Sequence, residues 1–295
     1  MRPGFLKFFW TALFLCVLVF APAVSFSNGL SIEVRGEFSQ GSVLFARVSG
    51  VSANASGTIG FLEKEFDMTN RSGALEATLP VPLDLAPGSY QVVASVVSDG
   101  VEERLSRTVS VSAKNYGVQR LALSGSQLAL YDDPQADRDN DAILEALGRC
   151  SEDAVSWTSK FTRPVDGRVS TQFGLRRYYG DDPEPEFHKG VDIAGYVGKR
   201  VVAPQNGVVL MTGEDLVLHG GVVVLSHGRG VGTIYLHLDS VCVSVGDRVR
   251  QGDVIGIMGE KGVATGPHLH WAAYSQGIPV SPWQLVTLPA SWLDE

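Results

Sequence analysis

Two histidines, His268 and His270, flank a single leucine near the end of the chain, in the stretch ATGPHLHW. In a β-strand, side chains alternate between the two faces, so residues i and i+2 point the same way. If this stretch is extended, both imidazoles share one face and Leu269 points to the other. The spacing indicates a metal site, or one metal ligand beside a proton-transfer group. The alternative is a pair of polar positions on a solvated strand.

Three further residues of the C-terminal half could join this pair in metal chemistry. In HKGVDIAG, His188 precedes Asp192 by four residues, and in TIYLHLD, His237 lies within an apolar-flanked strand. A catalytic zinc takes three protein ligands from histidine and carboxylate and leaves a fourth position for water. His188, Asp192 and one histidine of the HxH pair supply such a set. The sequence contains no HExxH, which excludes the helical zincin arrangement.

The segment from about Phe161 to Trp283 resembles the lysostaphin/LytM-type zinc endopeptidases of cell-wall metabolism. The matching stretches follow that family's order along the chain; they are FGLRR, HKGVDIAG, VVAPQNGVV, LSHGRGVGTIYLHLDSVCVSVGDRVRQGDVIG and GVATGPHLHW. The resemblance covers roughly two-fifths of the chain. The upstream GVQRLALSGSQLALY and the region before it are similar, more weakly, to the leader region of exported members.

The resemblance assigns a role to each of the five residues. It implies that His188, Asp192 and His270 bind zinc, whereas His237 and His268 flank the metal water and the scissile carbonyl. An imidazole in that place can transfer a proton, and another can donate to a developing oxyanion. The resemblance does not say which of these two histidines has which task.

The function implied by the resemblance is that of a zinc metalloendopeptidase. It would hydrolyse peptide cross-links or stem peptides of bacterial peptidoglycan, with a metal-activated water as nucleophile. One alternative is a non-catalytic LytM-like module that binds the wall or activates an amidase, and another is a secreted peptidase that acts on proteins. Degenerate modules typically lack one or more zinc ligands, whereas all five positions are present here, so the sequence favours the enzyme.

The two remaining histidines have structural interpretations. His227, in LSHGRG, matches a family position that is usually structural, and we expect a hydrogen-bonded turn histidine. His219, in LVLHGG, is expected to be exposed. Gly246 and Gly252 precede no helical pattern, so they are turn positions rather than parts of a phosphate-binding loop.

The elements that must position these side chains are mostly β. Residues 161–295 show strands and turns without a long helical period, which predicts an antiparallel, barrel-like sheet of the lysostaphin/LytM type that folds without the rest of the chain. Short alternating apolar segments over residues 28–115, separated by Gly, Ser and Asn-rich turns, predict an Ig-like β-sandwich. Between them, residues 116–160 predict a linker with one helix, whose apolar face would carry Ile143, Leu144 and Leu147.

Residues 1–27 have the layout of a secretory signal peptide. Arg2 and Lys7 precede an apolar run from Phe8 to about Ala21, and small residues follow, with cleavage expected near Ser25 or Ser27. The alternative is an uncleaved membrane anchor. No second apolar run of spanning length appears, so we expect export to the periplasm or cell envelope and no stable membrane insertion after cleavage.

Charge and cysteine content narrow the functional classes. The formal net charge is -8, and no basic stripe offsets it, which argues against a general nucleic-acid binder. Outside the leader the chain has two cysteines, Cys150 and Cys242. In an oxidising compartment they could form a disulfide, or they could be two buried small side chains.

Overall fold

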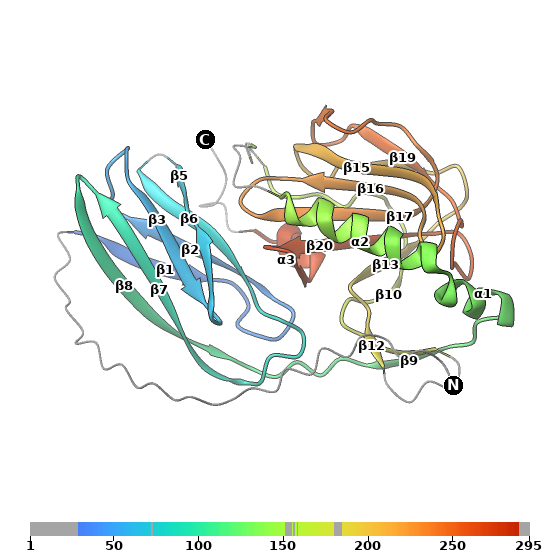
Figure 1. Cartoon of the computed structure of the whole chain (residues 1–295), viewed down its shortest axis with the longest axis horizontal. Helices are drawn as coiled ribbons and strands as arrows, with labels where there is room; N and C mark the ends of the chain where they lie inside the picture. The colour runs from blue at the N-terminus through green and yellow to red at the C-terminus, as the bar shows by residue number, and fades with distance from the viewer. Residues whose placement is uncertain are drawn as a thin grey trace.

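The computed structural model describes residues 29–288, apart from 72, 151–154, 156, 158 and 180–184. The chain is mostly β, with 50% strand and 11% helix, as the sequence predicts. Two β lobes lie side by side, and a helical segment runs along the second lobe (Figure 1). The predicted leader lies outside the described residues. Within them, no helix is both long and apolar enough to cross a membrane.

The N-terminal lobe consists of two four-stranded antiparallel sheets. One sheet has the order β1 (Ser31–Arg35), β2 (Val43–Ser49), β6 (Ala74–Pro80) and β5 (Thr69–Arg71). The other has the order β4 (Lys64–Asp67), β3 (Ser56–Phe61), β7 (Gly88–Ser98) and β8 (Val101–Val111). These strand orders are those of an immunoglobulin sandwich with a C′ strand. Membership of an immunoglobulin-like class stays a prediction.

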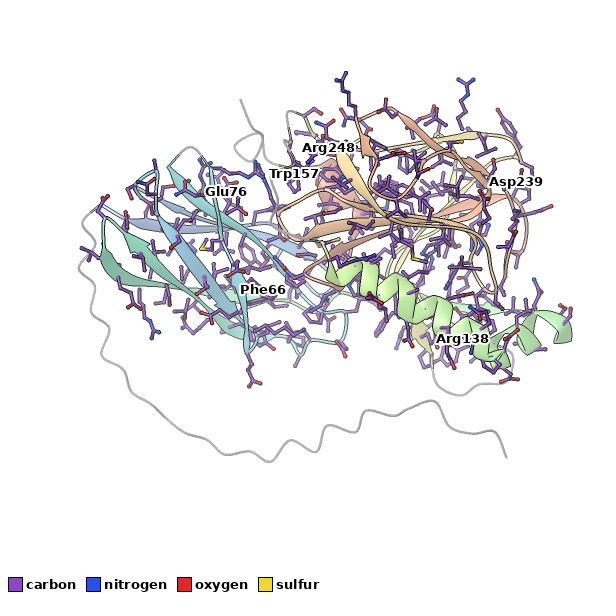
Figure 2. All side chains as sticks on the ribbon, turned by 45° about the horizontal axis from the view of Figure 1, so that its top comes forward. Phe66, Glu76, Arg138, Trp157, Asp239 and Arg248 are labelled. Atoms are coloured by element: carbon purple, nitrogen blue, oxygen red, sulfur yellow. The ribbon has the colours of Figure 1, made fainter. Side chains whose placement is uncertain are left out.

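Strand β2 contributes to two hydrophobic cores, because both of its faces are buried. Leu44, Ala46 and Val48 point into the core between the two sheets of the sandwich. Val43 and Phe45, on the other face, pack against residues of the C-terminal lobe, including Trp157 and Phe161 of the chain that leads into it. Figure 2 shows Trp157 between the two lobes.

A polar contact accompanies this apolar interface. Arg229 is only 1% exposed, and its guanidinium lies 3.6 Å from the Glu76 carboxylate of the sandwich and 4.3 Å from the ring centre of Trp157. Thr78 donates a hydrogen bond to the Arg229 carbonyl, and Ser275 donates to Thr78. The sandwich is therefore packed on the C-terminal lobe through buried contacts.

The linker contains one strand and three helical segments. They are β9 (Val118–Leu121), α1 (Gly125–Ala129), the 3-10 turn η1 (Leu130–Asp132) and α2 (Pro134–Gly148). Helix α2 begins where the Asp133 side chain accepts from the Gln135 N–H, with Pro134 at the first helical position.

Helix α2 packs its apolar face on β15 (Gly207–Leu216) and β16 (Gly220–Ser226). Ile143, Ala146 and Leu147 are buried against Val222 and Val224 of that sheet. The prediction for Leu144 is wrong: this side chain is 55% exposed. The face that meets the sheet is centred on Ala146, so Leu144 points away from it.

The main sheet of the C-terminal lobe has ten strands. Its main path runs β10 (Val169–Thr171), β13 (Gly190–Ala194), β20 (His268–Ser275), β17 (Val231–Val241), β16, β15 and β18 (Arg248–Val249). Beside this path lie β14 (Arg200–Val202), β19 (Val254–Met258) and β21 (Ile278–Val280), and helix α3 (Pro282–Val286) follows. All pairs in this sheet are antiparallel.

A small second sheet joins the linker to this lobe. Its order is β12 (Glu186–Phe187), β11 (Arg176–Tyr179) and β9, and β9 runs parallel to β11. The region from residue 161 onward is thus completed by a strand and a helix from the linker. The predicted boundaries at 115 and 160 stay predictions, but these contacts cross the one at 160.

The two cysteines of the described chain are free thiols. Cys150 is partly buried beside Leu147 and Ser226, and Cys242 is exposed directly after β17. Burial raises the pKa of the Cys150 thiol to about 12, so it is protonated at neutral pH. No disulfide links this pair. The alternative of two buried small side chains fits Cys150 only in part, and it is wrong for the exposed Cys242.

Candidate metal centre

The register of β13 and β20 brings the candidate ligands together. Asp192 lies directly opposite His270, and Ile193 lies opposite Leu269, in this antiparallel pair. Leu269 is fully buried in the core of the lobe. His268 and His270 therefore share the face that carries Asp192, as strand alternation predicts.

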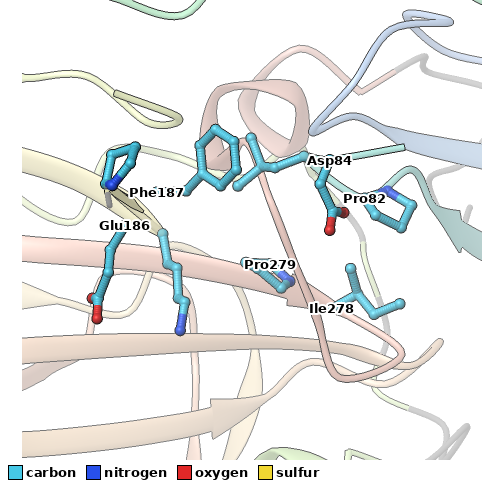
Figure 3. Close-up of a pocket in the computed structure, with 9 residues that line it drawn as sticks. Pro82, Asp84, Glu186, Phe187, Ile278 and Pro279 are labelled. Atoms are coloured by element: carbon cyan, nitrogen blue, oxygen red, sulfur yellow. The ribbon is translucent and has the colours of Figure 1, made fainter. Parts of the chain in front are cut away.

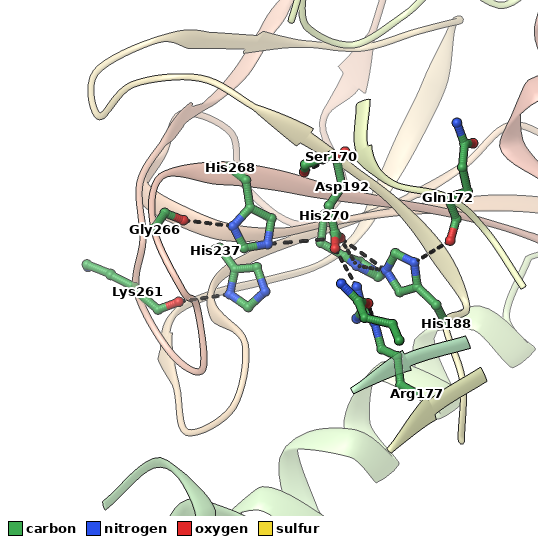
Figure 4. Close-up of polar contacts among 11 residues, drawn as sticks. Ser170, Gln172, Arg177, His188, Asp192, His237, Lys261, Gly266, His268 and His270 are labelled. Carbon is green, nitrogen blue, oxygen red and sulfur yellow. Dashed lines mark hydrogen bonds and ion pairs between the residues drawn. The ribbon is translucent and has the colours of Figure 1, made fainter. Parts of the chain in front are cut away.

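Three side-chain atoms converge on one point (Figure 4). His188 Nε2 lies 3.0 Å from Asp192 Oδ1 and 3.1 Å from His270 Nδ1, and His270 Nδ1 lies 2.9 Å from Asp192 Oδ1. Among the residues that the structure describes, these three form the one group of histidine, cysteine and carboxylate side chains close enough to hold a metal ion.

Hydrogen bonding explains why this point suits a cation. His188 Nδ1 donates to the Gln172 carbonyl at 2.8 Å, so in a singly protonated ring the proton is on Nδ1 and Nε2 carries a lone pair. This lone pair and the Asp192 carboxylate oxygen meet at His270 Nδ1. Neither of these two atoms can donate a hydrogen bond. The space between the three atoms must therefore hold either a proton on His270 Nδ1 or a cation.

Charge states favour the cation at neutral pH. Burial lowers the pKa of His270 to about 4, so the ring is neutral. Burial alone would raise the pKa of Asp192, but hydrogen bonds and charge interactions with His188 and His270 hold it well below its usual range. One carboxylate and two imidazoles are a donor set typical of a catalytic zinc site, so these residues fit the metal.

Gly190 makes room for His270. A Cβ atom at this position would lie 2.7 Å from His270 Nε2 and 2.7 Å from the Trp271 carbonyl oxygen. Both distances are shorter than Cβ contacts allow, so a larger residue would displace the imidazole or the strand.

A second pair of histidines lies beside the three converging atoms. The ring centres of His237 and His268 are 4.8 Å apart. His237 Nδ1 donates to the Lys261 carbonyl and His268 Nδ1 donates to the Gly266 carbonyl, each at 2.8 Å. In a singly protonated ring these bonds place the proton on Nδ1 and leave Nε2 with a lone pair. His268 Nε2 lies 3.9 Å from Asp192 Oδ1.

His237 has an unusual backbone conformation. Its φ is +62°, in the left-handed region that non-glycine residues rarely adopt. Its N–H donates to the His219 carbonyl at 2.8 Å, and its carbonyl accepts from the Gly259 N–H at 3.0 Å. Burial, with smaller contributions from His268 and His270, lowers the pKa of His237 to about 3. The ring is therefore held neutral and in one orientation by its surroundings.

The other two histidines are structural, and one of them contradicts the sequence prediction. His227 is fully buried, with Nδ1 donating to the Asn206 carbonyl and Nε2 accepting from the Thr233 hydroxyl, which confirms the hydrogen-bonded turn. The prediction that His219 is exposed is wrong. Helix α2 covers it, and its Nε2 lies 2.7 Å from Asn140 Oδ1.

Sequence reasoning missed one charged residue at the site. Arg177 lies on β11, and its NH2 group donates to Asp192 Oδ2 at 2.5 Å. The residue belongs to the stretch FGLRR, but that stretch carries no spacing that relates it to HKGVDIAG. Only the folded chain brings strand β11 next to the three converging residues.

A pocket of about 530 Å³ lies between the lobes, away from the converging atoms (Figure 3). Pro82 and Asp84 come from the sandwich, Phe187 and Lys189 flank His188 in the chain, and Ile278 lies on β21. None of the five predicted site residues lines it. The candidate chemistry therefore lies in the largely buried group around Asp192 rather than in this pocket.

Comparison with protein families identifies the region that carries these side chains. The model of Peptidase family M23 matches residues 186–282. This range contains the three converging residues and both histidines of the neighbouring pair.

Three curated proteins with similar sequences are named as peptidases. An uncharacterized metalloprotease of Haemophilus influenzae is 36% identical over 39% of this chain and 24% of its own length. Peptidoglycan DD-endopeptidase ShyA of Vibrio cholerae is 32% identical over 53% of this chain and 34% of its own. DD-carboxypeptidase/endopeptidase Mpg of Neisseria meningitidis is 37% identical over 43% and 29%. The matched part of the chain spans about a quarter to a third of each relative.

A solved structure resembles most of the chain. The crystal structure of a Pseudomonas aeruginosa protein, provisionally described as an M23 peptidase, superposes with a TM-score of 0.63 at 26% identity. The similarity covers 84% of this chain and 95% of that one. It extends well beyond residues 186–282, so the fold shared by the two proteins includes more than the matched family region.

Proposed function

We propose, for a chain that carries a Peptidase family M23 domain, that it is a zinc endopeptidase which hydrolyses peptide bonds of bacterial peptidoglycan. The substrate class follows the names of its relatives. One is named a peptidoglycan DD-endopeptidase and another a DD-carboxypeptidase/endopeptidase. In this proposal His188, Asp192 and His270 hold the metal, and His237 and His268 act on the substrate.

One observation carries the proposal. Nε2 of His188, Oδ1 of Asp192 and Nδ1 of His270 meet within 3.1 Å of one another, next to a second pair of histidines. A structural ion pair would need neither the second imidazole nor the neighbouring pair. Three ligands leave a position open for water or substrate, as catalytic sites require.

Bound zinc would supply Lewis acidity, which polarises a peptide carbonyl and activates a water. The chain's own residues do the rest. His188 and His270 would bind the metal through ring nitrogens, with the His270 ring neutral, and the Asp192 carboxylate would compensate part of the positive charge. Nε2 of His237 and of His268 can each accept a proton and return it to the leaving amine, because their Nδ1 atoms are occupied by carbonyls. An imidazole protonated at Nε2 can also donate to a developing oxyanion.

We also propose that the chain acts in the cell envelope or periplasm. The layout of residues 1–27 supports export, and a peptidoglycan substrate requires it. The sandwich would then lie close to the substrate, since buried contacts join it to the lobe that carries the site.

The test is digestion of isolated sacculi by the purified chain without its leader, followed by mass spectrometry of the released muropeptides. The proposal predicts peptide-bond cleavage products that require zinc and are absent with His188→Ala. A denatured protein substrate is incubated in parallel. Cleavage of that protein with intact muropeptides would instead identify a general peptidase. If neither the unsubstituted chain nor His188→Ala releases soluble fragments from the sacculi, the chain would instead be a non-catalytic wall-binding module.

A further inference from the structure

The carboxylate of Asp192 uses its two oxygens for different neighbours. Oδ1 faces His188 Nε2 at 3.0 Å and His270 Nδ1 at 2.9 Å. Oδ2 accepts a hydrogen bond from NH2 of Arg177 at 2.5 Å (Figure 4). The carboxylate plane is therefore fixed through the oxygen that does not face the two histidines.

Arg177 is itself held by a residue from the linker. Its Nε donates to Oε1 of Gln119 at 2.9 Å. The parallel pairing of β9 with β11 places Gln119 directly beside Arg177 in the register. The Arg177 side chain is only 13% exposed and that of Asp192 only 8%, so solvent competes little with either bond. A chain of two hydrogen bonds thus runs from the linker strand to a candidate metal ligand.

We propose that Arg177 is a positioning residue for the metal centre, and that Gln119 of the linker acts on this centre through Arg177. The inference rests on the proposed function, because it takes the three converging residues as zinc ligands. Arg177 bonds to Asp192, a ligand in the proposed function, and Gln119 bonds to Arg177, so metal affinity is the property that both should change.

Two effects of Arg177 on zinc binding have opposite signs. Its positive charge near the metal opposes binding of a divalent cation. Its hydrogen bond holds Asp192 in the rotamer that aims Oδ1 at the histidines, which favours binding. Loss of such an outer hydrogen-bond partner typically weakens metal affinity by about 10–100-fold. Gln119 carries no charge, so removal of its side chain tests the positioning effect without the electrostatic one.

The experiment measures the zinc Kd of the full chain without its leader by competition with a chromophoric chelator at constant pH. The variants are Arg177→Ala, Arg177→Lys, Gln119→Ala and the double variant of Arg177→Ala with Gln119→Ala. Thermal unfolding in excess chelator checks that each variant folds without metal. Arg176→Ala is the matched control, since this neighbouring arginine is exposed and alternates to the other face of β11.

We expect Arg177→Ala to raise the Kd about 10–100-fold. Gln119→Ala should raise it less, and it should have no further effect when Arg177 is already alanine, because Gln119 acts only through that side chain. Arg177→Lys keeps the charge but cannot bond both neighbours with one planar group, so it should recover only part of the affinity. Arg176→Ala should leave the Kd unchanged.

Three results would overturn the inference. An unchanged or lower Kd in Arg177→Ala would mean that the charge outweighs positioning or that Asp192 needs no support. Additive effects of the two substitutions would separate Gln119 from Arg177. If the unsubstituted chain binds no zinc, the proposed function is wrong and this inference fails with it. If all variants bind zinc with equal affinity, only this inference fails.

Discussion

Asp192 and His270 face each other directly across the β13–β20 strand pair, with Oδ1 and Nδ1 2.9 Å apart. A directly opposed pair on one sheet face is held by the backbone ladder on both sides, so the separation of these two atoms is set by the fold. His268 is two residues away on the same face, and its Nε2 is 3.9 Å from the same oxygen.

The first prediction separates the two histidines of the HxH pair. His270→Ala should abolish stoichiometric zinc binding, because it removes one of three ligands. His268→Ala should retain about one zinc per chain. Elemental analysis after dialysis against metal-free buffer checks both variants, and the opposite pattern would exchange the roles of the two residues.

The second prediction concerns His237. His237→Ala should keep the zinc but lower turnover by about 10²–10⁴-fold, the usual contribution of a general acid–base group. Hydrolysis of a soluble muropeptide and zinc content are measured on the same preparation. Loss of zinc in this variant would make His237 a ligand instead. Alanine also has to adopt the φ of +62° found here, so thermal unfolding is measured alongside.

The third prediction compares two leucines of helix α2. Leu147 is 2% exposed against the sheet, so Leu147→Ala should lower the free energy of unfolding by about 2–5 kcal/mol. Leu144 is 55% exposed on the same helix, and Leu144→Ala should change it by less than about 0.5 kcal/mol. Urea unfolding measures both. Equal effects would mean that α2 does not pack on β15 and β16.

Strand β2 of the sandwich shows where sequence reasoning reached its limit. Alternation in SVLFARVSGV predicts a strand, but it does not tell that Val43 and Phe45 face a second core. A period of two assigns residues to faces and leaves open what covers each face. For this reason a fragment that starts at Phe161, which lacks Trp157, α2 and β9, is expected to be less stable than the whole chain.

The site divides in the same way. The spacing of His268 and His270 placed both imidazoles on one strand face, because side chains alternate along a strand. His188 lies between β12 and β13, outside any strand, and it was assigned to the metal with Asp192 through the resemblance to the family. The hydrogen bonds to Arg177 and Gln119 join residues 15 and 58 positions apart. No local periodicity relates such residues, so only the pairing of β9, β11 and β13 with their neighbours could reveal them.

The fourth prediction is a pH dependence of stability that arises from His227. Burial lowers the pKa of this imidazole to about 4, below its ordinary value of 6.5. Between these values the unfolded chain binds a proton that the folded chain does not. Stability from this group is therefore complete above about pH 6.5, falls by about 1.4 kcal/mol per pH unit below it, and stops falling near pH 4.

The measurement is urea unfolding from pH 4 to 7 in excess chelator, for the unsubstituted chain and for His227→Gln. The slope of the free energy of unfolding against pH should be smaller in His227→Gln, by the amount that corresponds to about one proton. Thr233→Val is the control, because it removes the hydroxyl that bonds Nε2 of His227 but keeps the imidazole. It should lose stability at all pH values and retain the slope. Identical slopes in all three chains would contradict the assignment.

The most direct test of the account is a zinc titration of the metal-free chain while hydrolysis of a soluble cross-linked muropeptide is followed. The account predicts no cleavage without metal, a linear rise in rate up to one equivalent of zinc and a plateau beyond it. Asp192→Asn should show neither the rise nor tight zinc binding, because it weakens the ligand that faces both histidines. Cleavage by the metal-free chain, or a full rate in Asp192→Asn, would contradict the claim that His188, Asp192 and His270 hold the catalytic metal.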